Sequence, residues 1–251
     1  MPDVLLLHLN ELSEAIVATS LIKRLARDGN TVYCVSDAAA EPLFQFSGGR
    51  VIQPISVPVM SFDIAINLSP TFVCSELIRK ADAKNKLGFG LSHGQIEFYN
   101  DGAKRYYDTR YHGKKTKSNL FQLLYALADL TWQGEGYALG YFPRNRTRKS
   151  LTGLATKDAR LRDFLTANLK LEDSRIWHIP FKKNVLKHID ETNRCKQIVT
   201  DDALTLHAAL ALRKNVEYII PRELPYKVEM FGSGTIHVVD PKTIKNFTQE
   251  L

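Results

Sequence analysis

The first twenty residues constrain the fold of this chain more than any other stretch. Residues Val4 to Leu7 form a short, uninterrupted apolar run, which is typical of a buried parallel strand. A polar turn follows, and apolar residues then recur with helical spacing at Ile16, Leu21, Ile22 and Leu25. Ligands of open α/β sheets bind outside the carboxyl ends of the strands, so Glu11 and Glu14 lie where chemistry is usually done.

The strand-then-helix pattern continues along the chain. Apolar runs at 30–36 and 62–68 are each followed by a helical pattern, a further helix is expected at 119–130, and the alternation restarts after the basic linker 144–149. Between these elements, residues 92–117 are polar and aromatic and are expected to form an irregular surface excursion. The pattern predicts an α/β protein with parallel sheets in two domains, 1–145 and 150–251.

Composition limits the class of protein and its partners. The chain has 251 residues, of which 44% are hydrophobic, and it contains no apolar run near the roughly 18 residues that span a bilayer. The N-terminus also lacks the features of a signal peptide, so we expect a cytoplasmic protein. A net charge of +7 favours an anionic partner, which leaves nucleic acid, a phospholipid surface and a phosphorylated small molecule open. Cys34, Cys74 and Cys195 are expected to be buried thiols rather than a disulfide or metal framework.

Four segments, taken in order, resemble one known family. Residues 9–14 are similar to the turn Leu-x-x-Leu-Gly-Asp that follows the first strand in the ADP-heptose:lipopolysaccharide heptosyltransferases, and residues 62–89 and 119–130 resemble later segments of that family. Residues 199–209 resemble its donor signature Asp-[Ser/Thr]-Gly-x-x-His-x-Ala, with matches at Asp202, His207 and Ala209.

The resemblance implies a GT-B-like fold of two Rossmann-like lobes with parallel sheets. The N-terminal lobe would bind the acceptor, and the C-terminal lobe would bind a nucleotide-sugar donor. With about 100 residues, the C-terminal lobe is too short for a full lobe of this class by at least one strand and helix. Such enzymes transfer a heptose or similar hexose-like sugar with inversion, without a metal or other cofactor. The acceptor would be an anionic, phosphorylated lipopolysaccharide or surface glycan, reached by peripheral contact with the inner membrane, and no nucleic acid is expected.

The resemblance also assigns roles to particular residues. Glu14 lies at the position of the general base, a role that suits a carboxylate whose surroundings bring its pKa toward the working pH. Lys157 or Arg160 would anchor the donor diphosphate, because either cation stabilises a departing anion. The remaining candidates are Asp202 and His207 for the donor, and Asn10, Asn67 and Ser69 for the acceptor.

Several residues depart from the family pattern and keep a second hypothesis open. Glu14 and Ser13 replace the usual Asp and Gly, and Ala203 and Leu204 replace the Ser/Thr and Gly of the donor signature. The chain could therefore be a degenerate, non-catalytic descendant that acts as a binding or assembly subunit. Glu14 could also be a plain first-turn acid, Asp202 a plain helix N-cap and His207 a core histidine.

A third hypothesis, a nucleic-acid-binding protein, depends on one segment. Residues 104–115 interleave cations with aromatic side chains, which suits stacking on bases, on sugar rings or on polyanions. The alternative for this segment is a solvated loop.

Overall fold

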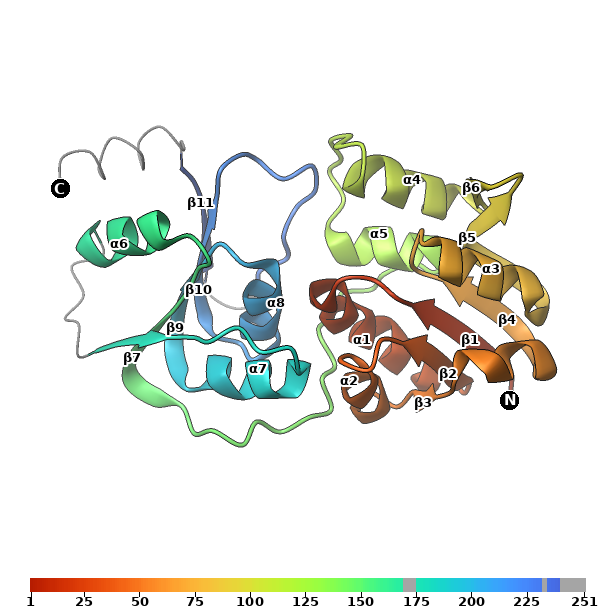
Figure 1. Ribbon diagram of the computed structural model, residues 1–251, viewed down its shortest axis with the longest axis horizontal. Helices are drawn as coiled ribbons and strands as arrows, with labels where there is room; N and C mark the ends of the chain where they lie inside the picture. Colours follow the sequence, from red (N-terminus) through yellow and green to blue (C-terminus); the bar gives the residue numbers. More distant parts are fainter. Residues whose placement is uncertain (169–174, 232–233, 240–251) are drawn as a thin grey trace. The chain divides into compact units, whose positions relative to one another are not determined.

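The computed structural model describes residues 1–168, 175–231 and 234–239, and it divides the chain into two compact units (Figure 1). The first unit consists of Met1–Tyr141 together with Leu224–Glu229, and the second consists of Phe142–Glu223 and Met230–Leu251. The structure differs from the expected division at 145–150 in one respect. A short segment of the C-terminal half, Leu224–Glu229, lies in the first unit.

The first unit is a six-stranded sheet with the order β3-β2-β1-β4-β5-β6. Neighbouring strands are parallel except β6, which is antiparallel to β5. The strands are β1 (Asp3–His8), β2 (Thr31–Ser36), β3 (Arg50–Val51), β4 (Ser61–Asn67), β5 (Asp82–Ser92) and β6 (Gln95–Phe98). The helices are α1 (Leu12–Arg27), α2 (Glu41–Phe46), α3 (Phe72–Lys80), α4 (Asp101–Arg110), α5 (Leu120–Leu127) and the 3-10 helix η1 (Pro54–Val59).

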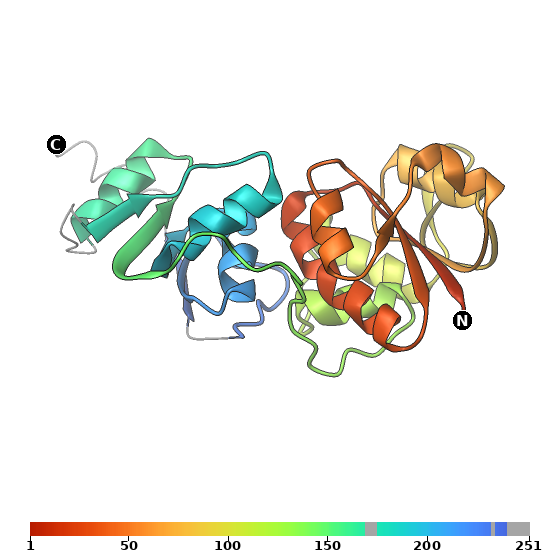
Figure 2. The same ribbon diagram turned by 90° about the horizontal axis from the view of Figure 1, so that it is seen from below.

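Both faces of β1 are buried, as its uninterrupted apolar run predicts. Leu5 and Leu7 belong to the core cluster that also contains Ile78 of α3. On the opposite face, the ring of His8 contacts the ring of Phe44 in α2, and α1 runs beside α2 (Figure 2). The first strand is therefore a central strand between two helical layers.

The expectation of an irregular excursion over 92–117 is wrong, because this segment contains β6 and α4. Asn100 caps α4, its side chain accepting a hydrogen bond from the third backbone N–H of the helix. Tyr106 is 2% exposed, and Tyr107 packs against Phe98 with ring centroids 5.4 Å apart. The helix buries Tyr106 and leaves the two cations that precede it exposed.

The second unit is a five-stranded parallel sheet with the order β11-β10-β9-β7-β8. Its strands are β7 (Arg148–Ala155), β8 (Ile176–His178), β9 (Cys195–Thr200), β10 (Asn215–Ile220) and β11 (Gly234–Val238). Within its described residues, the helices are α6 (Ala159–Asn168), α7 (Val185–Asn193) and α8 (Ala203–Ala211). The predicted alternation of strands and helices is confirmed in this half of the chain.

Two expectations from composition can be compared with the structure. Cys34, Cys74 and Cys195 are free thiols and are fully buried, which confirms that expectation. Burial raises the pKa of Cys34 to about 12 and that of Cys195 to about 11, so both are thiols at neutral pH. Among the described residues, no helix is both long and apolar enough to cross a membrane.

Candidate functional site

The candidate site of the first unit lies where the strand order of the sheet reverses. β1 has β2 on one side and β4 on the other, and the crevice at the carboxyl ends of such strands is the usual binding place in open α/β sheets. β1 ends at His8 and α1 begins at Leu12, so Glu14 falls in the first turn of the helix above this crevice. The position of Glu14 is therefore the one that the sequence predicts.

The carboxylate of Glu14 is buried and held by several donors. Only 6% of the residue is exposed. Oε1 accepts a hydrogen bond from Nε of Arg110 at 2.9 Å and another from its Nη2, while Oε2 accepts one from Nδ2 of Asn10. A carboxylate that pairs with a guanidinium in two contacts is held in one orientation. Glu14 is thus a fixed, partnered acid and not a solvated one.

Arg110, the last residue of α4, carries the charge that balances Glu14. Its Nη1 donates to the hydroxyl of Tyr226 at 3.0 Å, and its guanidinium lies 5.3 Å from the centre of the Tyr226 ring. Burial alone would lower the pKa of Arg110, but the charge of Glu14 more than offsets this and keeps the pKa above its ordinary value. The site therefore contains a permanent cation beside the carboxylate.

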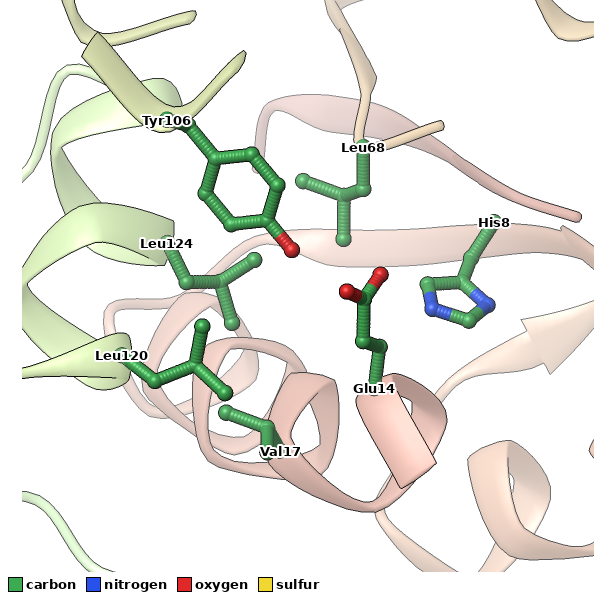
Figure 3. Close-up of a pocket in the computed structure, with 7 residues that line it drawn as sticks. All are labelled: His8, Glu14, Val17, Leu68, Tyr106, Leu120 and Leu124. Carbon is green, nitrogen blue, oxygen red and sulfur yellow. The ribbon is translucent and has the colours of Figure 1, made fainter. Parts of the chain in front are cut away.

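A small cavity lies beside the carboxylate, lined by His8, Glu14, Val17, Leu68, Tyr106, Leu120 and Leu124 (Figure 3). The hydroxyl of Tyr106 points toward Glu14, and the ring of His8 lies on the other side of the carboxylate. Neither ring nitrogen of His8 has a hydrogen-bond partner in the structure, and burial lowers the pKa of His8 to about 4. The cavity has a volume of about 10 Å³, room for about one water molecule.

The three residues predicted to bind the acceptor lie in different surroundings. Asn10 contacts Glu14 and also donates to the hydroxyl of Tyr111 at 3.1 Å. Asn67 and Ser69 are both fully buried. Nδ2 of Asn67 donates to a backbone carbonyl of β5 at 2.8 Å, and Oγ of Ser69 accepts from the backbone N–H that follows β1 at 3.0 Å. Direct contact of Asn67 and Ser69 with an acceptor has no support in this geometry, because both side chains are buried and hydrogen-bonded to the backbone.

The second unit also has a reversal of strand order, at β7. Lys157 follows β7 and Asp202 follows β9, its neighbour. Nζ of Lys157 lies 3.6 Å from Oδ1 of Asp202 and 4.8 Å from the centre of the Phe181 ring. The structure thus brings together two of the predicted donor-site residues at the carboxyl edge of this sheet.

Asp202 is the N-cap of α8, as one of the two interpretations of its sequence position predicts. Oδ2 accepts from the backbone N–H of Thr205 at 2.8 Å and from its hydroxyl at 2.9 Å. Capping uses one carboxylate oxygen, and the other faces Lys157. Of the remaining candidates, Arg160 is exposed in α6, whereas His207 is 5% exposed within α8.

Sequence reasoning missed Arg110 and Tyr226. The helical spacing of Ala103, Tyr106 and Arg110 was a usable signal for α4, but an arginine at a helix end gives no indication of its partner. Tyr226 belongs to the segment between β10 and β11 and had no local signal at all.

Comparison with known proteins finds similar folds but no match in sequence alone. No family model and no curated protein matches the chain in sequence. A family 9 glycosyltransferase from Veillonella parvula has a TM-score of 0.65 at 13% identity, with 100% of this chain and 90% of that chain covered. The E. coli ADP-heptose lipopolysaccharide heptosyltransferase II gives 0.63 at 11% identity, with 98% of each chain covered. The chain has the fold of these glycosyltransferases.

The E. coli heptosyltransferase WaaC, solved with ADP, gives a TM-score of 0.61 at 12% identity over 99% of each chain. The predicted resemblance to heptosyltransferases is confirmed for the fold, a GT-B-like arrangement of two α/β units with a reduced second lobe.

Proposed function

We propose that the protein is an inverting glycosyltransferase of the heptosyltransferase type. It moves a heptose or other hexose-like sugar from a nucleotide-diphospho-sugar to a phosphorylated lipopolysaccharide or surface-glycan acceptor. The observation that carries the proposal is the carboxylate of Glu14, buried at the strand-order reversal of the first sheet and held in one orientation by Arg110 and Asn10. A fold shared with WaaC supports the same class of reaction.

In this mechanism Glu14 is the general base. The oxygen of an acceptor hydroxyl attacks the anomeric carbon of the donor, and its proton passes to Glu14. The bond from that carbon to the diphosphate breaks, and its electron pair leaves with the nucleoside diphosphate. A carboxylate has about four acceptor positions, so the contacts with Arg110 and Asn10 leave room for an incoming hydroxyl proton.

The donor site of the proposal lies in the second unit. Lys157 and Arg160 would neutralise the diphosphate, and Asp202 with His207 would complete the donor pocket. Lys157 suits this role because its side chain is 73% exposed and its ammonium lies 3.6 Å from the carboxylate of Asp202. The presence of ADP in the WaaC structure suggests an adenine nucleotide as the first donor to test.

Calorimetric titration with ADP-heptose, ADP-glucose and UDP-glucose tests the proposal. We expect saturable binding of at least one donor below millimolar concentration, followed by release of the nucleoside diphosphate when de-acylated lipopolysaccharide is added. Absence of saturable binding for all three donors at millimolar concentration would overturn it.

A non-catalytic binding or assembly subunit is the second candidate. The observation that favours it is the donor turn, where Ala203 and Leu204 stand in place of a hydroxyl residue and a glycine at the start of α8. A branched side chain at a helix N-terminus restricts the approach of a phosphate to the backbone N–H groups. Absence of saturable donor binding by a correctly folded protein would favour this candidate. In either case we propose a cytoplasmic protein that meets an anionic glycolipid at the inner membrane.

A further inference from the structure

Tyr111 is an exposed aromatic residue beside the proposed base. It follows the last residue of α4 and is 45% exposed. Its hydroxyl accepts a hydrogen bond from Nδ2 of Asn10 at 3.1 Å, and the same amide nitrogen donates to Oε2 of Glu14. The side-chain amide of Asn10 thus bridges the hydroxyl of Tyr111 and the carboxylate of Glu14, which would remove the acceptor proton.

The ring of Tyr111 is fixed on one side. The ring of Tyr107 packs against it at a centroid distance of 5.0 Å and an interplanar angle of 32°. Tyr107 is itself anchored by Phe89 and Phe98, with ring centroids 6.1 and 5.4 Å away. Tyr111 is thus held by Tyr107 at its ring and by Asn10 at its hydroxyl, and 45% of the residue remains exposed.

A rigid aromatic face suits one class of ligand in particular. A pyranose ring presents a face of C–H groups that packs on an aromatic ring, while its hydroxyls remain free for polar groups around it. The face of an aromatic ring carries partial negative charge, which attracts the polarised C–H groups of a sugar. Because Tyr107 and Asn10 already hold Tyr111, little side-chain freedom is lost on binding.

We propose that Tyr111 is the stacking platform for the sugar ring that bears the attacking hydroxyl. This inference rests on the proposed function, since it states where the acceptor of Glu14 lies. Stacking on Tyr111 places a pyranose over the ring while its hydroxyls reach toward Asn10 and Glu14. The ligand class is a carbohydrate with an exposed C–H face.

Three variants separate the ring from the hydroxyl. Tyr111→Phe keeps the ring and removes the hydrogen bond to Asn10, whereas Tyr111→Leu removes the aromatic face. His112→Leu is the matched control, because His112 is the next residue, is also exposed and also contacts Tyr107, at 5.0 Å. Both positions are at the surface, and the circular dichroism of each variant is compared with that of the wild type.

Saturation-transfer NMR with methyl β-glucoside, β-galactoside and α-mannoside measures stacking without any transfer reaction. We expect saturation of ring C–H protons with the wild type, with Tyr111→Phe and with His112→Leu, and its loss with Tyr111→Leu. In the transfer assay, Tyr111→Leu should raise the KM for the acceptor about tenfold and leave the KM for the donor unchanged.

The outcomes distinguish this inference from the proposed function. If the sugars bind through Tyr111 but no donor reacts, the platform stands and the transferase proposal fails. If transfer occurs and Tyr111→Leu leaves the acceptor KM unchanged, the platform is overturned while the transferase proposal stands. Equal saturation in the wild type and Tyr111→Leu would also overturn the platform. So would the absence of saturation in the wild type at about 50 mM sugar, a concentration that detects very weak binding.

Discussion

The hydroxyl of Tyr226 lies 3.0 Å from Nη1 of Arg110, although the two residues are 116 positions apart in the chain. Tyr226 belongs to the segment Leu224–Glu229, which leaves the strands of the second unit and packs in the first. Further hydrogen bonds hold this segment, including those from the backbone N–H of Thr116 to Pro225 at 2.8 Å and from Asn119 to Glu229 at 3.0 Å. Because Arg110 also holds Glu14, a C-terminal segment takes part in fixing the proposed base.

Replacing Tyr226 by phenylalanine should weaken this arrangement without removing the ring. The variant loses one hydrogen bond to a charged group, so we expect the free energy of unfolding to fall by about 1.5 kcal/mol. Tyr226→Leu, which also removes the ring beneath the guanidinium, should cost more. Urea unfolding at constant m-value measures both effects, and equal stability of Tyr226→Phe and the wild type would show that the contact does not hold Arg110.

Replacing Glu14 by glutamine should abolish most transfer and leave the fold intact. The amide oxygen can still accept from Arg110, but the side chain can no longer take a proton, so we expect kcat to fall by about 10²- to 10⁴-fold. Glu11→Gln is the matched control, since Glu11 is an exposed acid three positions earlier. A Glu14→Gln protein with full activity would remove the base assignment.

Replacing Lys157 by methionine should weaken donor binding. The variant keeps an unbranched side chain of similar length and loses the ammonium that would meet the diphosphate, so we expect a Kd for ADP about tenfold higher, or about 1.4 kcal/mol. Lys196→Met serves as control, because Lys196 is exposed near the opposite end of β9. Calorimetry measures both, and equal weakening by the two substitutions would point to general charge attraction.

Stability should depend on pH through His8. Burial holds the pKa of His8 at about 4 in the folded protein, against 6.5 as the ordinary value, although the charge of Asp37 acts in the opposite direction. Between these values the unfolded chain binds a proton that the folded protein does not. The contribution of neutral His8 is therefore complete above pH 6.5 and is lost as the pH falls toward 4, by about 3 kcal/mol in total.

His8→Leu tests this contribution. Urea unfolding between pH 7 and 4.5 should give a flatter profile for His8→Leu than for the wild type, whereas His178→Leu, at an exposed histidine, should follow the wild type. Burial also lowers the pKa of His188. Part of the pH dependence of stability therefore remains in every variant, because His188 is present in all of them. An unchanged profile in His8→Leu would contradict the effect.

Local pattern was enough to predict most elements of the fold. The apolar run of β1, the helical spacing of α1 and the capping role of Asp202 are properties of short segments, and all three are confirmed. Residues 92–117 were misjudged because the buried positions of α4 are few and are interleaved with cations. Tyr106 becomes a core residue only when α4 packs beside α5.

The sequence by itself determined the alternation of strands and helices and, through it, the place of Glu14 at the end of the first strand. Chain connectivity fixes that place, because a strand and the turn that follows it are adjacent in any fold. Only the tertiary structure decided what surrounds the carboxylate. Arg110 lies 96 positions away and Tyr226 belongs to the C-terminal half, so their contacts depend on how whole elements pack. Packing also buried Asn67 and Ser69 and left the ring of Tyr111 exposed.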